Sequence, residues 1–146
     1  MRFHLVDRID AIEPLRMVLA RKLTSRMEDF WRDEGRGPEM PAPLVLESLC
    51  QAGSWLAFAS TGRRAVLLSV DVVAFLAPVR PGDVLGLRGV VESIDEERAA
   101  LSGTASVEGE VVMRADTILC ALRPADELED VEALGRMYEQ LVRGAS

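Results

Sequence analysis

The sequence contains little of what metal-binding and disulfide-rich proteins require. Its 146 residues include two cysteines and one histidine. Cys50 and Cys120 lie in separate apolar runs, without a Cys-x-x-Cys pair or a Cys/His cluster. This spacing argues against a disulfide framework and against a common zinc site. We therefore expect two buried thiols and no requirement for a metal or a cofactor.

Positive charge is also scarce. The chain has 17 lysines and arginines against 24 aspartates and glutamates, which gives a formal net charge of -7 and a sequence pI near 4.8. Proteins that bind nucleic acids need a concentrated basic surface to neutralise phosphates. The composition therefore argues against a nucleic-acid partner.

The amino-terminal residues lack a long apolar run. Residues 1–10 (MRFHLVDRID) carry four charges and no uninterrupted apolar stretch of seven residues. A secretory signal or a membrane span needs such a stretch. We expect a cytoplasmic protein.

Repeats, low-complexity tracts and Ser/Gly linkers are absent from the sequence. With 49% apolar residues, the chain is long enough for one hydrophobic core and short for two. The sequence predicts one domain over residues 1–146, in which residues 124–146 form a carboxy-terminal helical extension.

The hydrophobic pattern predicts an α+β protein. Alternating apolar residues indicate a strand over residues 15–24, and helical spacing indicates a long helix over residues 43–60. Residues 31–42, with two glycines and two prolines, are typical of an irregular loop. Further strands are predicted over residues 65–76, 84–95, 98–108 and 111–122, followed by an amphipathic helix from residue 124. This order favours one antiparallel sheet curved around a single helix.

The long helix carries the candidate chemistry. It is apolar nearly all round, so we expect it to be buried on most sides, and Glu47 is its one charged residue. Gln51 lies one turn further along the same face, and Trp55 and Phe58 continue it, so this face could line a tunnel. Glu47 is either a general acid or base whose pKa is raised by apolar surroundings, or a structural buried carboxylate. The helical pattern alone does not choose between the two.

Three motifs, in order, resemble those of one enzyme family. Residues 40–53 (MPAPLVLESLCQAG) resemble the Met-Pro-Gly-x-Leu-x-x-Glu-x-x-x-Gln segment of the beta-hydroxyacyl-[acyl-carrier-protein] dehydratases. Residues 75–83 (FLAPVRPGD) resemble that family's Phe-x-x-Pro-Val-x-Pro-Gly-Asp turn, and residues 3–9 (FHLVDRI) resemble its first strand. The resemblance implies a hotdog fold, in which an antiparallel sheet wraps a long central helix. The residues from Pro124 onward lie outside the matched pattern.

The resemblance also implies a function and a site. It implies a hydro-lyase that dehydrates 3-hydroxyacyl thioesters of an acyl-carrier protein or coenzyme A in fatty-acid or polyketide metabolism. It implies a homodimer, or a heterodimer with a related hotdog subunit, because the substrate tunnel is usually completed across a dimer. By resemblance Glu47 is the acid and the Ala42 amide binds the thioester carbonyl. The remaining residues implied to bind substrate are Met40, Pro41, Gln51 and Trp55.

The sequence departs from the family at its catalytic histidine. Counting back from Met40 places Asp33 at that position, and Phe30 and Pro38 match on either side, so the alignment holds there. The one histidine, His4, lies at the start of the chain, where packing at the edge of a strand is the expected role. Asp33 is therefore either a substitute base or a solvated loop charge.

A second departure lies at the start of the helix. Ala42 stands where the family has glycine, and Pro43 removes the next backbone donor. The Ala42 amide survives as a donor for the enolate that forms during the reaction. Its methyl group would crowd the carbonyl.

Three hypotheses follow. The chain is a dehydratase that uses Glu47 with Asp33 or a water as base, or a non-catalytic subunit that binds acyl chains or pairs with an active homologue, or an acyl thioesterase. Outside this site, Arg63, Arg64 and Arg80 are either docking residues for an acidic carrier protein or solvated charges. Residues 33–39 carry two glycines among acidic residues, which predicts turn formers instead of a phosphate site.

Overall fold

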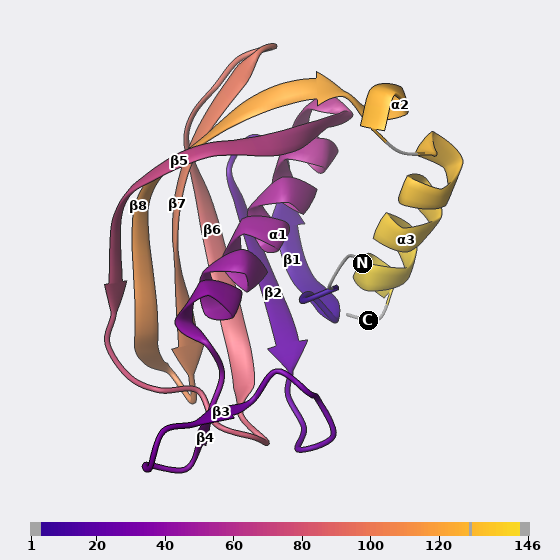
Figure 1. Ribbon diagram of the computed structural model, residues 1–146. Coiled ribbons are helices and arrows are strands. Elements are labelled where there is room, and N and C mark those ends of the chain that lie inside the picture. Colours follow the sequence, from indigo (N-terminus) through magenta and orange to yellow (C-terminus); the bar gives the residue numbers. More distant parts are fainter. Residues whose placement is uncertain (1–3, 129, 144–146) are drawn as a thin grey trace.

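The computed structural model describes residues 4–128 and 130–143 of the chain. In this part, a six-stranded sheet curves around the long helix α1 (Ala42–Thr61), and every neighbouring pair of its strands is antiparallel (Figure 1). The strands, in their order across the sheet, are β1 (Arg8–Glu13), β2 (Met17–Leu23), β6 (Val84–Ile94), β7 (Arg98–Val107), β8 (Glu110–Pro124) and β5 (Arg63–Phe75). The predicted α+β fold is confirmed.

Small residues let α1 lie close to the inner face of the sheet. A Cβ added to Gly53 of α1 would stand 2.9 Å from Leu101 Cδ1. One added to Gly103 of β7 would stand 2.3 Å from the Arg88 carbonyl oxygen and 2.9 Å from Leu49 Cδ1. The helix therefore buries one apolar face, which consists of Val45, Ser48, Leu49, Ala52, Gly53, Trp55, Leu56 and Ala57.

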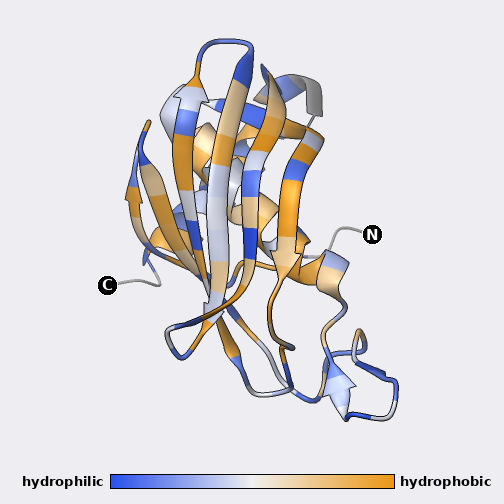
Figure 2. Ribbon diagram, turned by 90° about the vertical axis from the view of Figure 1, so that its left-hand side faces the viewer, coloured by the Kyte–Doolittle hydropathy of each residue, from blue (hydrophilic) through white to orange (hydrophobic). Residues whose placement is uncertain are grey.

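The opposite face of α1 is open in the single chain. Figure 2 views the sheet from its outer side, with hydrophilic and hydrophobic stretches along the strands and α1 behind them. The sheet covers one side of the helix only, and Glu47 on the other side is exposed. Of the residues of α1, only Pro43 and Glu47 are exposed, so the helix is covered on most sides, as predicted. The expectation that Glu47 lies buried among apolar residues is wrong for the single chain. One curved sheet can cover only part of a helix, and the apolar pattern alone does not show which part.

The loop before α1 contains a small hairpin that the sequence did not predict. Strands β3 (Arg32–Asp33) and β4 (Pro38–Glu39) pair antiparallel near the amino-terminal end of α1 (Figure 1). Gly35 and Gly37 turn the hairpin with φ of 108° and 91°, which is backbone that favours glycine. The prediction that they are turn formers is confirmed.

The carboxy-terminal residues form the predicted helical extension as two helices, α2 (Ala125–Leu128) and α3 (Val131–Arg143). Asp130 precedes α3, and its Oδ1 accepts the amide of Glu132 at 3.0 Å. Leu134 is buried, and Met137 and Leu141 pack against the core. Within the described residues, no helix is both long and apolar enough to cross a membrane.

Candidate active site

Hydrogen bonds from two backbone amides bring the three family-like motifs together around the first half of α1. The Met40 amide, just before the helix, donates to the Val79 carbonyl in the proline turn at 2.8 Å. The Leu5 amide of the first motif donates to Oε1 of Gln51 at 2.8 Å. Segments distant in sequence are thus fixed to the residues on either side of Glu47.

Glu47 and Gln51 form a hydrogen-bonded pair on the open face of α1. Nε2 of Gln51 donates to Oε1 of Glu47 at 3.3 Å, while the other end of the Gln51 amide accepts from Leu5. Gln51 therefore links the carboxylate to the amino-terminal segment and limits where it can point. A carboxylate that is exposed and held by one neutral donor is available to a substrate on this face.

Cys50 lies beside this pair and is not a nucleophile at neutral pH. Burial, followed by the charge of Glu47 and then that of Cys120, raises the pKa of Cys50 to about 12. The thiolate is the reactive form, so this cysteine is inert. Cys120 is buried, as the sequence predicted, whereas Cys50 is half-buried.

The start of α1 can bind a negative charge, but with few backbone donors. Pro41 precedes the helix with φ −55° and ψ 133° and without a side-chain cap, and Pro43 lies in the first turn. The first amides of a helix have no partner within it, and they carry the positive end of the helix dipole. Ala42 supplies such an amide, half-buried beside the buried Met40.

Asp33 is an exposed residue of the small hairpin. Its Oδ1 accepts the amides of Gly35 and Gly37 at 2.9 and 3.1 Å. Both hydrogen bonds use the same oxygen, so they fix the orientation of the carboxylate. The structure thus assigns Asp33 a role in shaping the hairpin, and its predicted role as a base stays a prediction.

Trp55 is buried instead of open to the face that Glu47 occupies. Its ring centroid lies 6.0 Å from that of Phe58 and 5.9 Å from that of Tyr138 on α3, and the last two are 5.8 Å apart. These three residues are the aromatic cluster. Arg64 adds its guanidinium 5.2 Å from the Trp55 ring, and burial raises the pKa of Tyr138. No feature of the sequence predicted that α3 would reach this helix.

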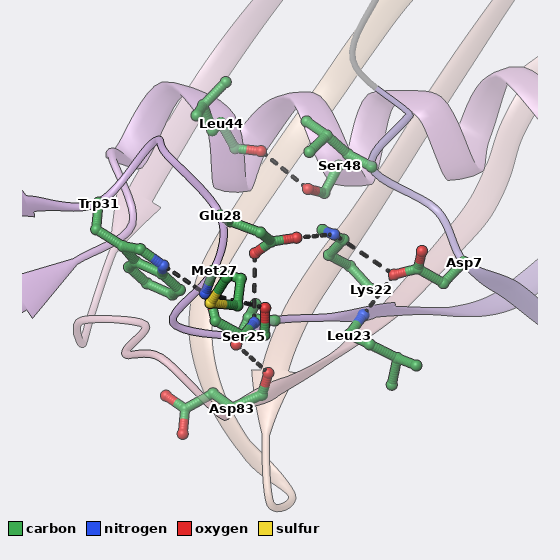
Figure 3. A network of polar contacts seen from close by, with 12 residues as sticks. Asp7, Lys22, Leu23, Ser25, Met27, Glu28, Trp31, Leu44, Ser48 and Asp83 are labelled. Carbon is green, nitrogen blue, oxygen red and sulfur yellow. Dashed lines mark hydrogen bonds and ion pairs between the residues drawn. The ribbon is translucent and has the colours of Figure 1, made fainter.

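An ion-pair network around the buried Lys22 was not predicted from the sequence. Lys22 is only 5% exposed, and its Nζ lies 2.5 Å from Oε1 of Glu28 and 3.5 Å from Oδ2 of Asp7 (Figure 3). Asp7 Oδ2 also accepts the amide of Leu23 at 2.6 Å. The signal was present, because strand alternation places Lys22 on the same face as the buried Val18. The network ties the first motif to β2.

The one histidine, His4, is exposed near the start of the chain. It borders a cavity of about 310 Å³, with Lys22 at its wall. The lining residues are His4, Leu5, Lys22, Met27, Glu28, Asp29 and Phe30. Leu5 lines this cavity and is hydrogen-bonded to Gln51, so the cavity lies next to the Glu47–Gln51 pair. Glu47 itself does not line the cavity.

Two of the three arginines considered for docking have partners within the chain. Arg80 Nη2 lies 3.5 Å from Glu39, and Nη1 donates to the Pro38 carbonyl at 3.3 Å, so Arg80 fixes β4 to the proline turn. Arg64 stacks on Trp55. Across residues 4–128 and 130–143, no group of three or more His, Cys, Asp or Glu residues is placed to bind a metal ion.

Comparisons with known proteins agree with this arrangement, although no family model matches the chain. The 3-hydroxyacyl-[acyl-carrier-protein] dehydratase FabZ of Sodalis glossinidius (strain morsitans) is 38% identical over 129 residues, covering 83% of each chain. FabZ of Anaeromyxobacter sp. (strain Fw109-5) is 39% identical over 124 residues, covering 78% of this chain and 77% of the other.

Solved structures share the fold at lower identity. The dehydratase heterocomplex ApeI:P from Xenorhabdus doucetiae has a TM-score of 0.69 at 16% identity, over 92% of this chain and 89% of the other. The smu.793 protein from Streptococcus mutans UA159, bound to acetyl CoA, has a TM-score of 0.70 at 14% identity, over 84% and 93%. The sequence relatives decide the family and these structures decide the fold: the chain belongs to the FabZ 3-hydroxyacyl-[acyl-carrier-protein] dehydratases and has their hotdog fold.

Proposed function

We propose that this protein interconverts 3-hydroxyacyl and 2-enoyl thioesters, with Glu47 as the acid that protonates the leaving hydroxyl. The observation that carries the proposal is the exposed Glu47, held by Gln51 on the helix that contains the family motif. In dehydration a base takes the proton from C2, the C3–O bond breaks, the C2=C3 double bond forms, and Glu47 gives its proton to the departing hydroxyl as water. Addition of water reverses these steps and returns the proton to Glu47.

The Ala42 amide is the proposed donor to the thioester carbonyl. Removal of the C2 proton places negative charge on that oxygen, and an amide at the positive end of a helix stabilises such charge. Met40, whose amide is bonded to Val79, and Pro41 fix the backbone that presents this donor. With proline at residue 43, we expect weaker stabilisation than a second amide would allow.

The base in this proposal is Asp33 or a water molecule in its place. Asp33 stands at the position of the family histidine, and its two hairpin hydrogen bonds orient the carboxylate. General bases contribute about 10²- to 10⁴-fold to a rate, so replacing an imidazole is expected to lower turnover greatly. The activity proposed here is accordingly slow.

The proposed working unit is a dimer joined through β5. This strand lies at one edge of the sheet, so its outer backbone groups have no neighbouring strand within the described chain. Its exposed large apolar residues are Val66, Leu67, Leu68, Val72 and Phe75. A long apolar edge strand in water favours pairing with a second strand, and such pairing would bring another subunit beside the open face of α1.

A second candidate function is that of a partner subunit in a hotdog heterodimer. Aspartate at the histidine position favours it, because a related subunit that carries the histidine would supply the missing base. The heterocomplex from Xenorhabdus doucetiae, a dehydratase built from two different chains, shares the fold. In that arrangement this chain would contribute Glu47 and the acyl-binding face. A cytoplasmic location and the choice between acyl-carrier protein and coenzyme A stay predictions.

Hydration of crotonyl-pantetheine, followed by loss of enoyl absorbance, tests the main proposal. We expect measurable turnover by the purified protein and a loss of about 10²- to 10⁴-fold in Glu47→Gln. Glu96→Gln, which changes an exposed glutamate in the turn between β6 and β7, is the matched control and should retain full activity.

Each other result has a defined meaning. Full activity in Glu47→Gln would refute Glu47 as the acid. Inactivity of the pure protein, followed by activity on addition of a histidine-bearing homologue, would favour the partner subunit. Release of free thiol from a saturated acyl thioester would indicate a thioesterase.

A further inference from the structure

The face of α1 that carries Glu47 continues to Phe58 of the aromatic cluster; Glu47 is exposed, and the residues beyond it on this face are half-buried. Glu47, Gln51, Ser54 and Phe58 follow one another at helical spacings of four, three and four residues, so they lie along one face. At 1.5 Å per residue, about 12 Å of helix separates Glu47 from Trp55. An acyl chain that extends from a thioester at Glu47 toward the carboxy-terminal end of α1 therefore meets the aromatic cluster.

The third ring of the aromatic cluster, Tyr138, lies outside the family-like motifs. Tyr138 belongs to α3, and its ring lies within 6 Å of both Trp55 and Phe58, inside the range of favourable ring packing. Helix α3 is anchored by the buried Leu134 and lies alongside β1 and the carboxy-terminal half of α1 (Figure 1). Tyr138 is thus held in place by a separate packed element.

The surroundings resist displacement of these rings. Trp55 is 6% exposed, with Arg64 placed 5.2 Å from its ring on another side. Opening the cluster would separate the three rings and expose part of Trp55, at the cost of buried apolar area and ring contacts. A flexible apolar chain gains little by entering unless it also fills the space that the rings leave.

We infer that Tyr138, with Trp55 and Phe58, sets the maximum acyl length of this protein, so that it binds short and medium acyl thioesters and rejects long ones. This inference rests on the proposed function, because it places the thioester at Glu47. Tyr138 is a specificity residue and not a catalytic residue, since it lies at the far end of the acyl path. The limit on acyl length depends on the carboxy-terminal helical extension, because Tyr138 belongs to α3.

The test compares acyl lengths in wild type and Tyr138→Ala. Hydration is measured with crotonyl-, octenoyl- and tetradecenoyl-pantetheine, and calorimetry measures binding of the matching saturated thioesters. We expect wild type to use the first two and to discriminate against the third. Tyr138→Ala should raise the ratio of tetradecenoyl to crotonyl kcat/KM by roughly tenfold or more, because single methylenes in apolar pockets change specificity by about that factor.

Two control variants separate specificity from stability. Tyr138→Phe keeps the ring, and Met137→Ala truncates the neighbouring residue of α3 outside the aromatic cluster. Both variants should keep the wild-type ratio of tetradecenoyl to crotonyl kcat/KM even where the melting temperature falls. If Tyr138→Ala does not fold, Tyr138→Leu replaces it as a smaller apolar side chain. An unchanged ratio in the truncated variant, or equal use of all lengths by wild type, would overturn the inference.

Calorimetry measures acyl binding without catalysis, so it tests the limit on acyl length separately from the proposed function. If no enoyl thioester is hydrated but short saturated thioesters bind and long ones bind only to Tyr138→Ala, the length limit stands and the catalytic proposal fails. If the protein binds no acyl thioester of any length, both are overturned.

Discussion

The variant Asp33→His is the sharpest test of the proposed catalytic site. The change Asp33→His places an imidazole, the side chain most often used in general acid and base catalysis, at the position that the sequence motif predicts for the family histidine. We expect kcat/KM for crotonyl-pantetheine hydration to rise about 100-fold, the lower end of what a general base supplies. The gain should vanish when Glu47→Gln is added, because the base and the acid act in one reaction.

Asp33→His should lower the stability of the fold only slightly. Asp33 is exposed, and it loses only two hydrogen bonds, to the amides of Gly35 and Gly37, which water can replace. We expect a loss of about 1 kcal/mol, which lowers the melting temperature by about 4 °C in a chain of this size. Asp33→Asn is the control, since its Oδ1 still accepts both amides but it cannot act as a base.

The outcomes divide the alternatives. Asp33→Asn with lower activity than wild type would identify Asp33 as the base, whereas equal activity would assign that role to water. The reasoning fails if Asp33→His gains nothing, or if its gain persists without Glu47. No gain would mean that the hairpin does not face the reacting carbons, whereas a gain that persists without Glu47 would mean that Glu47 is not the acid that acts with the imidazole.

Three further predictions concern packing and pH. Gly103→Ala should destabilise the fold by about 3 kcal/mol, because its Cβ would stand 2.3 Å from the Arg88 carbonyl oxygen. Gly135→Ala should stabilise α3 by about 1 kcal/mol, because alanine favours a helix more than glycine does and its Cβ would meet nothing within 4 Å. Thermal melts check both, and equal melting temperatures would contradict the packing described here. Burial, followed by Glu47 and Cys120, raises the pKa of Cys50 from 9.0 to about 12, so the folded chain keeps a proton that the unfolded chain loses. Stability should therefore fall as pH rises from 9 toward 12, and urea unfolding across that interval should show a smaller fall in Cys50→Ala.

The sequence by itself determined the fold and the position of Glu47 beside Gln51. Alternating and helical patterns located the long strands and α1 to within about two residues at their ends. The spacing of four placed Glu47 and Gln51 on one face, and their side chains are hydrogen-bonded in the structure. The motifs identified the family, because they specify turns and a helix start that depend mainly on local residues.

Tertiary structure alone decided what surrounds these residues. An apolar pattern states that a face prefers burial, but it does not name the element that covers it. For this reason Glu47 was expected in an apolar environment and is exposed in the single chain. Trp55 was expected to continue a face that lines a tunnel, and it packs instead against Tyr138 of α3. The contact between Trp55 and Tyr138 joins residues more than eighty positions apart, and no local property of either residue specifies it. Long-range packing of this kind depends on how the whole sheet curves, and that geometry exists only in the folded chain.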